Sequence, residues 1–413
     1  MAAYGPRACG RARSHVIALL GELIGQPDPV AADIGRWTVA DDEWLDVLLP
    51  ARLLAGALVL ADGKAGVALA LCSMVAFRPV VCDGLPIHIA LSCHPVRARR
   101  VASESGSGAA ASISDAVAPF PRSALAKALA RPDDGWVHRY RSDMVQAARL
   151  YAMVADNRLD LAWQAICGAS NPGDVLYHEA LLREAGAGAD AAAPLDALCA
   201  LERLGLVRAL DQYVVGRVLE ELEADPSVVL AANISALSAV HDQWWVAIEQ
   251  RLLGRRDVAR RLVIEITETA EIAPSQATAF ADRMRSLGCR IALDDFGVGF
   301  ASIRRLMALS PDIVKVDAYF THRALQSERD RQIFVHAIGL AYAISPLVIV
   351  EGVEADAERA LAEKVGVAWI QGAYAGRPTV VRSWMGAVPR RQGDAPSRFP
   401  DVATAHFTGG AVA

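Results

Sequence analysis

The sequence predicts an α/β protein in which a TIM-like (β/α)8 barrel follows a smaller α/β domain. Eight short apolar runs alternate with longer segments whose apolar residues recur at helical spacing, which is the pattern of a barrel. The chain has 413 residues, enough for a barrel of about 250 residues and a second domain. Residues 102–119 are small, polar and aperiodic, so we expect a flexible loop or linker there.

The eight expected barrel strands lie in the second part of the chain, and two of the clearest helical stretches between them are 196–223 and 275–287. The strands are expected at 161–167, 175–182, 228–234, 262–267, 290–294, 313–317, 347–351 and 368–371. Apolar residues at three-and-four spacing after Ser142 predict a helix that leads into this part. The expected organisation is a small domain over 1–141, a connecting helix over 142–157, the barrel over 158–385 and a poorly ordered tail over 386–413.

The composition of the chain limits which ligands the protein is expected to bind and in which compartment it is expected to work. A net charge of -5 and a pI near 6.0 leave no general basic surface for nucleic acid, so any phosphate-bearing ligand would have to be held locally, by metal or by a few Arg and Lys. We therefore expect a small ligand and no nucleic acid polymer. The seven cysteines show no CxxC and no zinc-type spacing, which favours reduced thiols in a cytoplasmic protein. No apolar run reaches the roughly 20 residues of a membrane helix, so we expect no membrane span.

Polar residues fall at the ends of the expected strands, each beside apolar neighbours. They are Glu179, Asn233, Glu265, Asp294, Asp295, Lys315, Asp317 and Glu351. A buried carboxylate is costly unless it is paired or metal-bound, and for Glu265, Lys315 or Asp317 alone a salt bridge or hydrogen bond is the favoured explanation. Taken together, the acids exceed what Lys315 can neutralise, which predicts divalent cations. Oxygen ligands without His or Cys favour Mg²⁺ or Mn²⁺ over zinc.

A set of short motifs carries a resemblance to a known family. The string His178-Glu179-Ala180-Leu181-Leu182-Arg183 contains the letters E-A-L, a match that is common by chance when it stands alone. The rest of the set is Ala232-Asn233-Ile234-Ser235, Glu265-Ile266-Thr267-Glu268, Asp294-Asp295-Phe296-Gly297, Lys315-Val316-Asp317, Glu351-Gly352-Val353-Glu354, and Gln371-Gly372 with Arg377-Pro378. In order and approximate spacing these motifs resemble EAL-family phosphodiesterases over residues 158–382.

The resemblance implies a barrel that binds two divalent ions and hydrolyses cyclic di-GMP to linear pGpG through a metal-activated water. Carried over position by position, one ion would be held by Glu179, Asn233, Glu265 and Asp294, and the second by Asp294, Asp295 and Glu351. Glu351 would act as metal ligand or general base. Lys315 would orient the water or offset charge on the phosphoryl oxygens.

The resemblance also implies supporting roles and a dimer. Arg183 would contact a substrate phosphate, with Gln164 and Gln371 assisting, although a solvated or salt-bridged arginine is the alternative for Arg183. Loop anchoring and support would come from Glu268, Asp317 and Glu354. A homodimer through the barrel is a family expectation. The alternative function is a catalytically silent cyclic di-GMP receptor acting through its N-terminal domain, which the sequence disfavours because no metal ligand is missing.

Residues 1–141 resemble the later half of a GGDEF, or diguanylate cyclase, domain. Ile34-Gly35-Arg36 leads to Ala40-Asp41-Asp42-Glu43-Trp44 and to an expected strand over Leu45–Leu49, while 87–92 could match a later strand. Both glycines of the GGDEF hairpin are absent, and they are needed for a tight turn close to the nucleotide phosphates. We therefore expect a degenerate domain without cyclase activity that packs, dimerises or regulates; an unrelated small α/β domain is the alternative.

Overall fold

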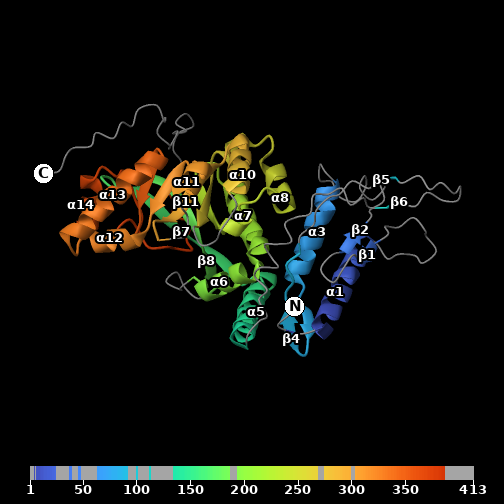
Figure 1. Cartoon of the computed structure of the whole chain (residues 1–413). Coiled ribbons are helices and arrows are strands. Elements are labelled where there is room, and N and C mark those ends of the chain that lie inside the picture. Colours follow the sequence, from blue (N-terminus) through green and yellow to red (C-terminus); the bar gives the residue numbers. More distant parts are fainter. Residues whose placement is uncertain are drawn as a thin grey trace. The chain divides into compact units, whose positions relative to one another are not determined.

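The computed structural model describes residues 4, 6–24, 37–39, 45–47, 63–91, 99–100, 111–112, 134–186, 193–267, 274–298 and 303–386. The chain divides into two compact units, Met1–Tyr151 and Ala152–Ala413, which are shown in Figure 1. Helix α5 (Asp134–Ala155) spans the division and begins before the expected start at residue 142. The aromatic rings of Trp136 and Tyr140 stack one helical turn apart, with centroids 5.0 Å apart, and extend the apolar pattern toward the start of the helix.

The first unit contains helices and short hairpins. Its elements are α1 (Pro6–Ile24), β1 (Trp37–Val39), β2 (Leu45–Val47), α3 (Gly63–Phe77), β3 (Val80–Cys82), β4 (Leu85–Ile87), β5 (Arg99–Arg100) and β6 (Ala111–Ser112). Helices α1 and α3 pack through Leu19, Leu20, Leu71 and Val75. Among the described helices of the chain, none has the length and apolar character needed to cross a bilayer.

The residues that carry the GGDEF resemblance are only partly described. Strands β1 and β2 pair antiparallel, with Trp37 opposite Val47 and Val39 opposite Leu45, so a strand does begin at Leu45. Residues 34–36 and 40–44 lie outside the described residues, and the resemblance stays a prediction. Of the expected loop at 102–119, only Ala111–Ser112 is described, and it pairs with β5. The tail after residue 386 also lies outside the described residues.

The second unit is a closed eight-stranded barrel, and each of the eight expected strands is present. The strands are β7 (Leu159–Gly168), β8 (Val175–Glu184), β9 (Leu230–Ile234), β10 (Leu262–Thr267), β11 (Arg290–Phe296), β12 (Ile313–Val316), β13 (Leu347–Val350) and β14 (Trp369–Ile370). They follow one another around the barrel in chain order, and β14 closes onto β7. The TIM-like fold predicted from the sequence is confirmed.

Strand β7 departs from the standard all-parallel barrel. It pairs antiparallel with both β8 and β14, whereas the other neighbouring strands run parallel. Only residues 169–174 join β7 to β8, and they include Asn171, Pro172 and Gly173, which favour a turn. Parallel strands need a crossover of a dozen or more residues, so this short connection produces a hairpin.

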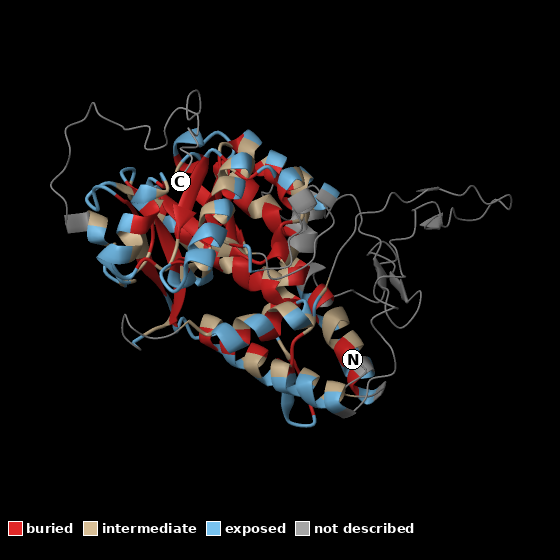
Figure 2. Ribbon diagram, turned by 60° about the vertical axis from the view of Figure 1, so that its left-hand side comes forward, coloured by how far each residue is buried: buried red, intermediate tan, exposed pale blue. Residues whose placement is uncertain are grey.

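Helices surround the barrel, and the face of each helix that points inward packs against the strands. They are α6 (Leu195–Leu204), α7 (Val207–Ala224), η1 (Ala236–Ser238), α8 (Gln243–Leu252), α9 (Arg256–Ala259), α10 (Pro274–Leu287), α11 (Ile303–Leu309), α12 (Ala318–Ala324), α13 (Glu328–Ile344), α14 (Asp356–Lys364) and η2 (Ser383–Gly386). Figure 2 shows the strands as almost continuously buried and the helices as exposed on their outer faces. Burial on both sides explains why these strands are nearly uninterrupted apolar runs.

The interior of the barrel is layered. One apolar layer takes a residue from each strand: Ile166, Tyr177, Ala231, Val263, Ala292, Ile313, Ile349 and Trp369. Side chains on one face of a strand recur every second residue, so the next inward position on the parallel strands is two residues later. Those positions are Glu179, Asn233, Glu265, Asp294, Lys315, Glu351 and Gln371. On β7, which runs the other way, the matching position is Gln164, two residues earlier. A polar layer therefore lies on an apolar one.

A buried carboxylate ties helix α7 to the segment that follows Asn233. Asp211 Oδ2 accepts hydrogen bonds from the Ser235 backbone N–H at 3.0 Å and from the Ser238 hydroxyl at 2.6 Å. Burial raises the pKa of Asp211 to about 7, although these two hydrogen bonds oppose the rise. The hydrogen bonds fix the chain as it leaves β9.

We expect the stability of the protein to depend on pH through Asp211. Its folded pKa of about 7 lies above that of an unfolded aspartate, so its stabilising contribution is complete at low pH and is lost as pH rises through about 7. Asp211→Asn keeps an oxygen that accepts both hydrogen bonds but cannot titrate. Between about pH 5 and about pH 8 the wild type should lose roughly 2 kcal/mol relative to this variant. Urea unfolding at both pH values measures the difference, and an equal gap at both would contradict the assignment.

Candidate active site

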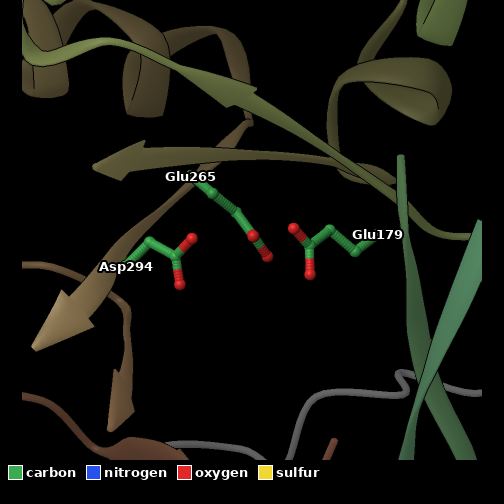
Figure 3. A group of neighbouring side chains, drawn as sticks. All are labelled: Glu179, Glu265 and Asp294. Carbon is green, nitrogen blue, oxygen red and sulfur yellow. The ribbon is translucent and has the colours of Figure 1, made fainter. Parts of the chain in front are cut away.

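Four carboxylates surround one lysine in the polar layer of the barrel. Lys315 Nζ lies 3.0 Å from Glu179 Oε2, 2.9 Å from Glu265 Oε2, 2.9 Å from Asp294 Oδ1 and 2.8 Å from Glu351 Oε1. The side chain of Lys315 is 1% exposed. In Figure 3 the carboxylates of Glu179, Glu265 and Asp294 point toward one another from three different strands. The strands thus bring residues far apart in sequence to one centre.

Amide side chains hold Glu179 in place. Asn233 Nδ2 donates to Glu179 Oε1 at 2.5 Å, and Gln371 Nε2 donates to Glu179 Oε2 at 2.6 Å. Gln371 Nε2 also donates to Gln164 Oε1 at 3.1 Å. Burial raises the pKa of Glu179, but the charge of Lys315 and these amide hydrogen bonds outweigh burial and leave the pKa lowered. Glu179 therefore stays ionised near neutral pH.

The other acids of the cluster hold protons more readily. Burial raises the pKa of Glu265 to about 8, with Lys315 opposing the rise and Glu179 and Asp294 adding to it. Burial likewise raises the pKa of Glu351 well above its usual value, against the charge of Lys315. Burial lowers the pKa of Lys315, but the four carboxylates outweigh it and raise that pKa well above normal. One permanent positive charge faces an excess of acid groups.

A β-bulge brings both aspartates of the Asp294-Asp295 pair to the same side. Leu293 pairs with Val314 and Phe296 with Val316, so β11 has one extra residue between these pairs. In a regular strand neighbouring side chains point to opposite faces. Asp295 has a positive φ of 57°, an uncommon conformation for a residue other than glycine. Burial and the neighbouring Asp294 and Asp317 raise the pKa of Asp295 to about 6.

The donors of this cluster fit divalent metal ions. Two groups bring one ligand oxygen from each member within 4.8 Å of one another, namely Glu179, Glu265 and Asp294, and Asp294, Asp295 and Glu351. Asp294 belongs to both groups, as a shared ligand would. The buried Asn233 Oδ1 has no hydrogen-bond partner in the described part of the chain and could serve as a further ligand. Oxygen donors alone suit hard cations.

Three of the predicted site residues lie apart from the carboxylate cluster, and a fourth lies outside the residues that the structure describes. Arg183 lies four residues beyond Glu179 on β8, is buried, and donates from Nη1 to the Leu182 carbonyl at 2.9 Å. Asp317 Oδ1 accepts from the Tyr319 backbone N–H at 2.8 Å and thereby caps α12. Glu354 is exposed and lies 3.8 Å from His322 Nε2. Glu268 lies outside the described residues.

One residue of the site was missed by the reasoning from sequence. Tyr177, fully buried in the apolar layer, donates its hydroxyl to Glu265 Oε1 at 2.7 Å. It lies two residues before Glu179 on the same face of β8, and this spacing was the available signal.

The model of the EAL domain family matches residues 147–378, more than half of the chain and the whole of the site. The chain belongs to the EAL domain family. The cyclic di-GMP phosphodiesterase PdeF of Escherichia coli is 31% identical over 235 residues, which cover 56% of this chain and 31% of that protein. The probable cyclic di-GMP phosphodiesterase PdeA of the same organism is 36% identical over 130 residues, which cover 31% of this chain and 18% of that protein. The chain thus spans a third or less of these relatives.

A solved structure supports the EAL fold. The EAL enzyme Bd1971, in a form with cAMP and cyclic di-GMP bound, superposes with a TM-score of 0.53 at 22% identity, covering 62% of this chain and 71% of that one. At this identity the likeness concerns the fold.

Removing the lysine from the EAL cluster should destabilise the metal-free protein. Lys315→Met leaves the carboxylates without their cation, and breaking a buried ion pair in this way costs roughly 3–5 kcal/mol. Added Mn²⁺ should restore part of the loss, since it supplies positive charge to the same oxygens. Urea unfolding with a chelator and with Mn²⁺ measures both effects. Lys364→Met, on the exposed surface of α14, is the matched control. Equal losses in the two variants would argue against the central position of Lys315.

Proposed function

We propose that this protein is a metal-dependent phosphodiesterase that hydrolyses cyclic di-GMP to linear pGpG. The observation that carries the proposal is the pair of oxygen-only ligand groups that share Asp294 inside the barrel. Two such sites side by side are the arrangement that phosphodiester hydrolysis uses. The relatives named cyclic di-GMP phosphodiesterases support the choice of substrate.

The proposed ligands follow the two groups. Glu179, Asn233, Glu265 and Asp294 would hold one ion, and Asp294, Asp295 and Glu351 the second. Mg²⁺ or Mn²⁺ is the proposed metal at both sites because every donor is an oxygen. When bound, two such ions lower the pKa of a shared water and stabilise the attacking and leaving oxygens.

Glu351 and Lys315 are the proposed catalytic residues. The raised pKa of Glu351 makes its carboxylate a stronger base than an ordinary glutamate, as a group that accepts a proton from water requires. Its side chain is 15% exposed, more than that of any other carboxylate around Lys315, so it lies at the side of the cluster open to solvent. The ammonium of Lys315, 2.8 Å from Glu351, orients the water or offsets charge on the phosphoryl oxygens.

Three residues are proposed to bind the substrate. Arg183 lies on the same face of β8 as Glu179, four residues nearer the end of the strand, and its guanidinium suits a phosphate. Gln164 and Gln371 contribute amide groups beside Glu179. Asp317 and Glu354 would support the loops around the site, and the proposed anchoring role of Glu268 rests on its sequence motif.

A cytoplasmic location and a homodimer through the barrel complete the proposal. In the described part of the chain Cys82, Cys167, Cys199 and Cys289 are free thiols, in keeping with a reducing compartment. The dimer rests on the family resemblance. Sedimentation at several protein concentrations tests it.

The decisive experiment incubates purified full-length protein with cyclic di-GMP and Mg²⁺ or Mn²⁺ and follows pGpG by chromatography. Turnover that stops when the metal is chelated supports the proposal. Binding of cyclic di-GMP by calorimetry without turnover, at every metal and protein concentration, would replace it with the silent receptor.

Glu351→Ala should lower the turnover number by roughly 10²–10⁴-fold, the range typical of losing a general base. The protein should remain folded, because Glu351 is partly exposed and its loss leaves three carboxylates for Lys315. Steady-state kinetics at saturating metal measure the effect. Glu220→Ala, on the exposed face of α7, is the control. Wild-type turnover in Glu351→Ala would remove this residue from the mechanism.

A further inference from the structure

We propose that Tyr177 is a positioning residue whose hydroxyl fixes the Glu265 carboxylate for divalent metal binding. The hydroxyl lies 2.7 Å from Glu265 Oε1, while Glu265 Oε2 lies 2.9 Å from Lys315 Nζ. The inference rests on the metal site of the proposed function. It adds a residue from the layer below that site.

The two oxygens of Glu265 have different surroundings. Oε2 faces the centre that Glu179 and Asp294 also face, whereas Oε1 is directed to the tyrosine. The terminal torsion of a glutamate is broad, so the side chain alone does not select which oxygen faces the centre. The hydroxyl of Tyr177 makes that selection by donating to Oε1. Glu265 is thereby presented to a metal through Oε2.

The apolar layer is built to bring a phenol to this place. Tyr177 shares its layer with Ala231 and Ala292, two of the smallest side chains available, and all three are fully buried. The small side chains of Ala231, on the neighbouring strand β9, and of Ala292, on β11, therefore leave room for a large ring inside the barrel. Every other member of the layer is aliphatic except Trp369, so the hydroxyl of Tyr177 is a polar group in apolar surroundings. A buried tyrosine hydroxyl needs an acceptor, and Glu265 supplies it.

Loss of the hydroxyl has a definite chemical consequence. Tyr177→Phe leaves Oε1 of a fully buried carboxylate without a donor, so the carboxylate is no longer held with Oε2 toward the centre and can turn both oxygens toward Lys315. A carboxylate without a fixed orientation is a poorer ligand. Hydrogen-bond partners of metal ligands typically contribute about 10- to 100-fold to metal affinity.

Calorimetric titration of the full-length protein with MnCl₂ tests the inference. We expect the Kd of Tyr177→Phe to rise about 10-fold or more over the wild type. Tyr342→Phe is the matched control: Tyr342 lies on helix α13, outside the polar layer, and its hydroxyl donates to the Gly366 carbonyl at 3.2 Å. An unchanged Kd in Tyr177→Phe would overturn the inference. A wild type that binds no Mn²⁺ would instead overturn the proposed function, a distinguishable result.

A second measurement does not depend on the folding of Tyr177→Phe. Fluorotyrosine introduced at position 177 alone keeps the ring and the hydroxyl. Binding of MgCl₂ at Oε2 withdraws charge from the Glu265 carboxylate and weakens the bond from the phenol, so the fluorine resonance should shift during the titration and saturate with the calorimetric Kd. A resonance that does not move while Mg²⁺ binds would show that Tyr177 only fills space.

Discussion

The burial of four carboxylates around one ammonium is the constraint on which the rest of this barrel depends. Each acid would be costly to bury alone, and Lys315 touches all four. The surrounding structure serves this arrangement. Asn233 and Gln371 donate to Glu179, Tyr177 donates to Glu265, and a continuous apolar layer closes the barrel beneath them. The polar layer is thus supported from the side and from below.

Much of the fold could be predicted because buried parallel strands leave a plain signal. Each strand is a short apolar run on both faces, and each of the eight runs became a strand. The reversed direction of β7 was not predicted, since a strand has the same periodicity whichever way it runs. The information lay in the loop at 169–174, which is too short for a crossover helix. The start of α5 was not predicted because its first two turns are polar apart from Trp136, Val137 and Tyr140.

The candidate site was predictable where it depends on strand ends and unpredictable where it depends on local geometry. Glu265 pairs with Ala292, and Asp294 lies two residues further along β11 on the same face, so the stagger of the tilted barrel strands brings both carboxylates to one level. The motif predicts Asp295 as a ligand, whereas the alternation of side chains along β11 would place it on the face of the strand opposite to Asp294. A β-bulge brings both side chains to one side, and the sequence does not reveal that bulge. Tyr177 was missed because an aromatic ring in an apolar run is normally core, and its acceptor lies 88 residues away.

The charges of the cluster also explain why a lysine and metal ions are compatible at one centre. Lys315 neutralises one negative charge and leaves an excess, which the metal-free protein relieves by the raised pKa of Glu265, about 8, and of Asp295, about 6. Protons and divalent ions therefore compete for the same oxygens, and metal binding must release protons. Lys315 holds the carboxylates close together before a metal binds, although carboxylates so close to one another repel each other strongly. The ammonium thus gathers the carboxylates without neutralising all of their negative charge. A divalent ion supplies the positive charge that is still lacking.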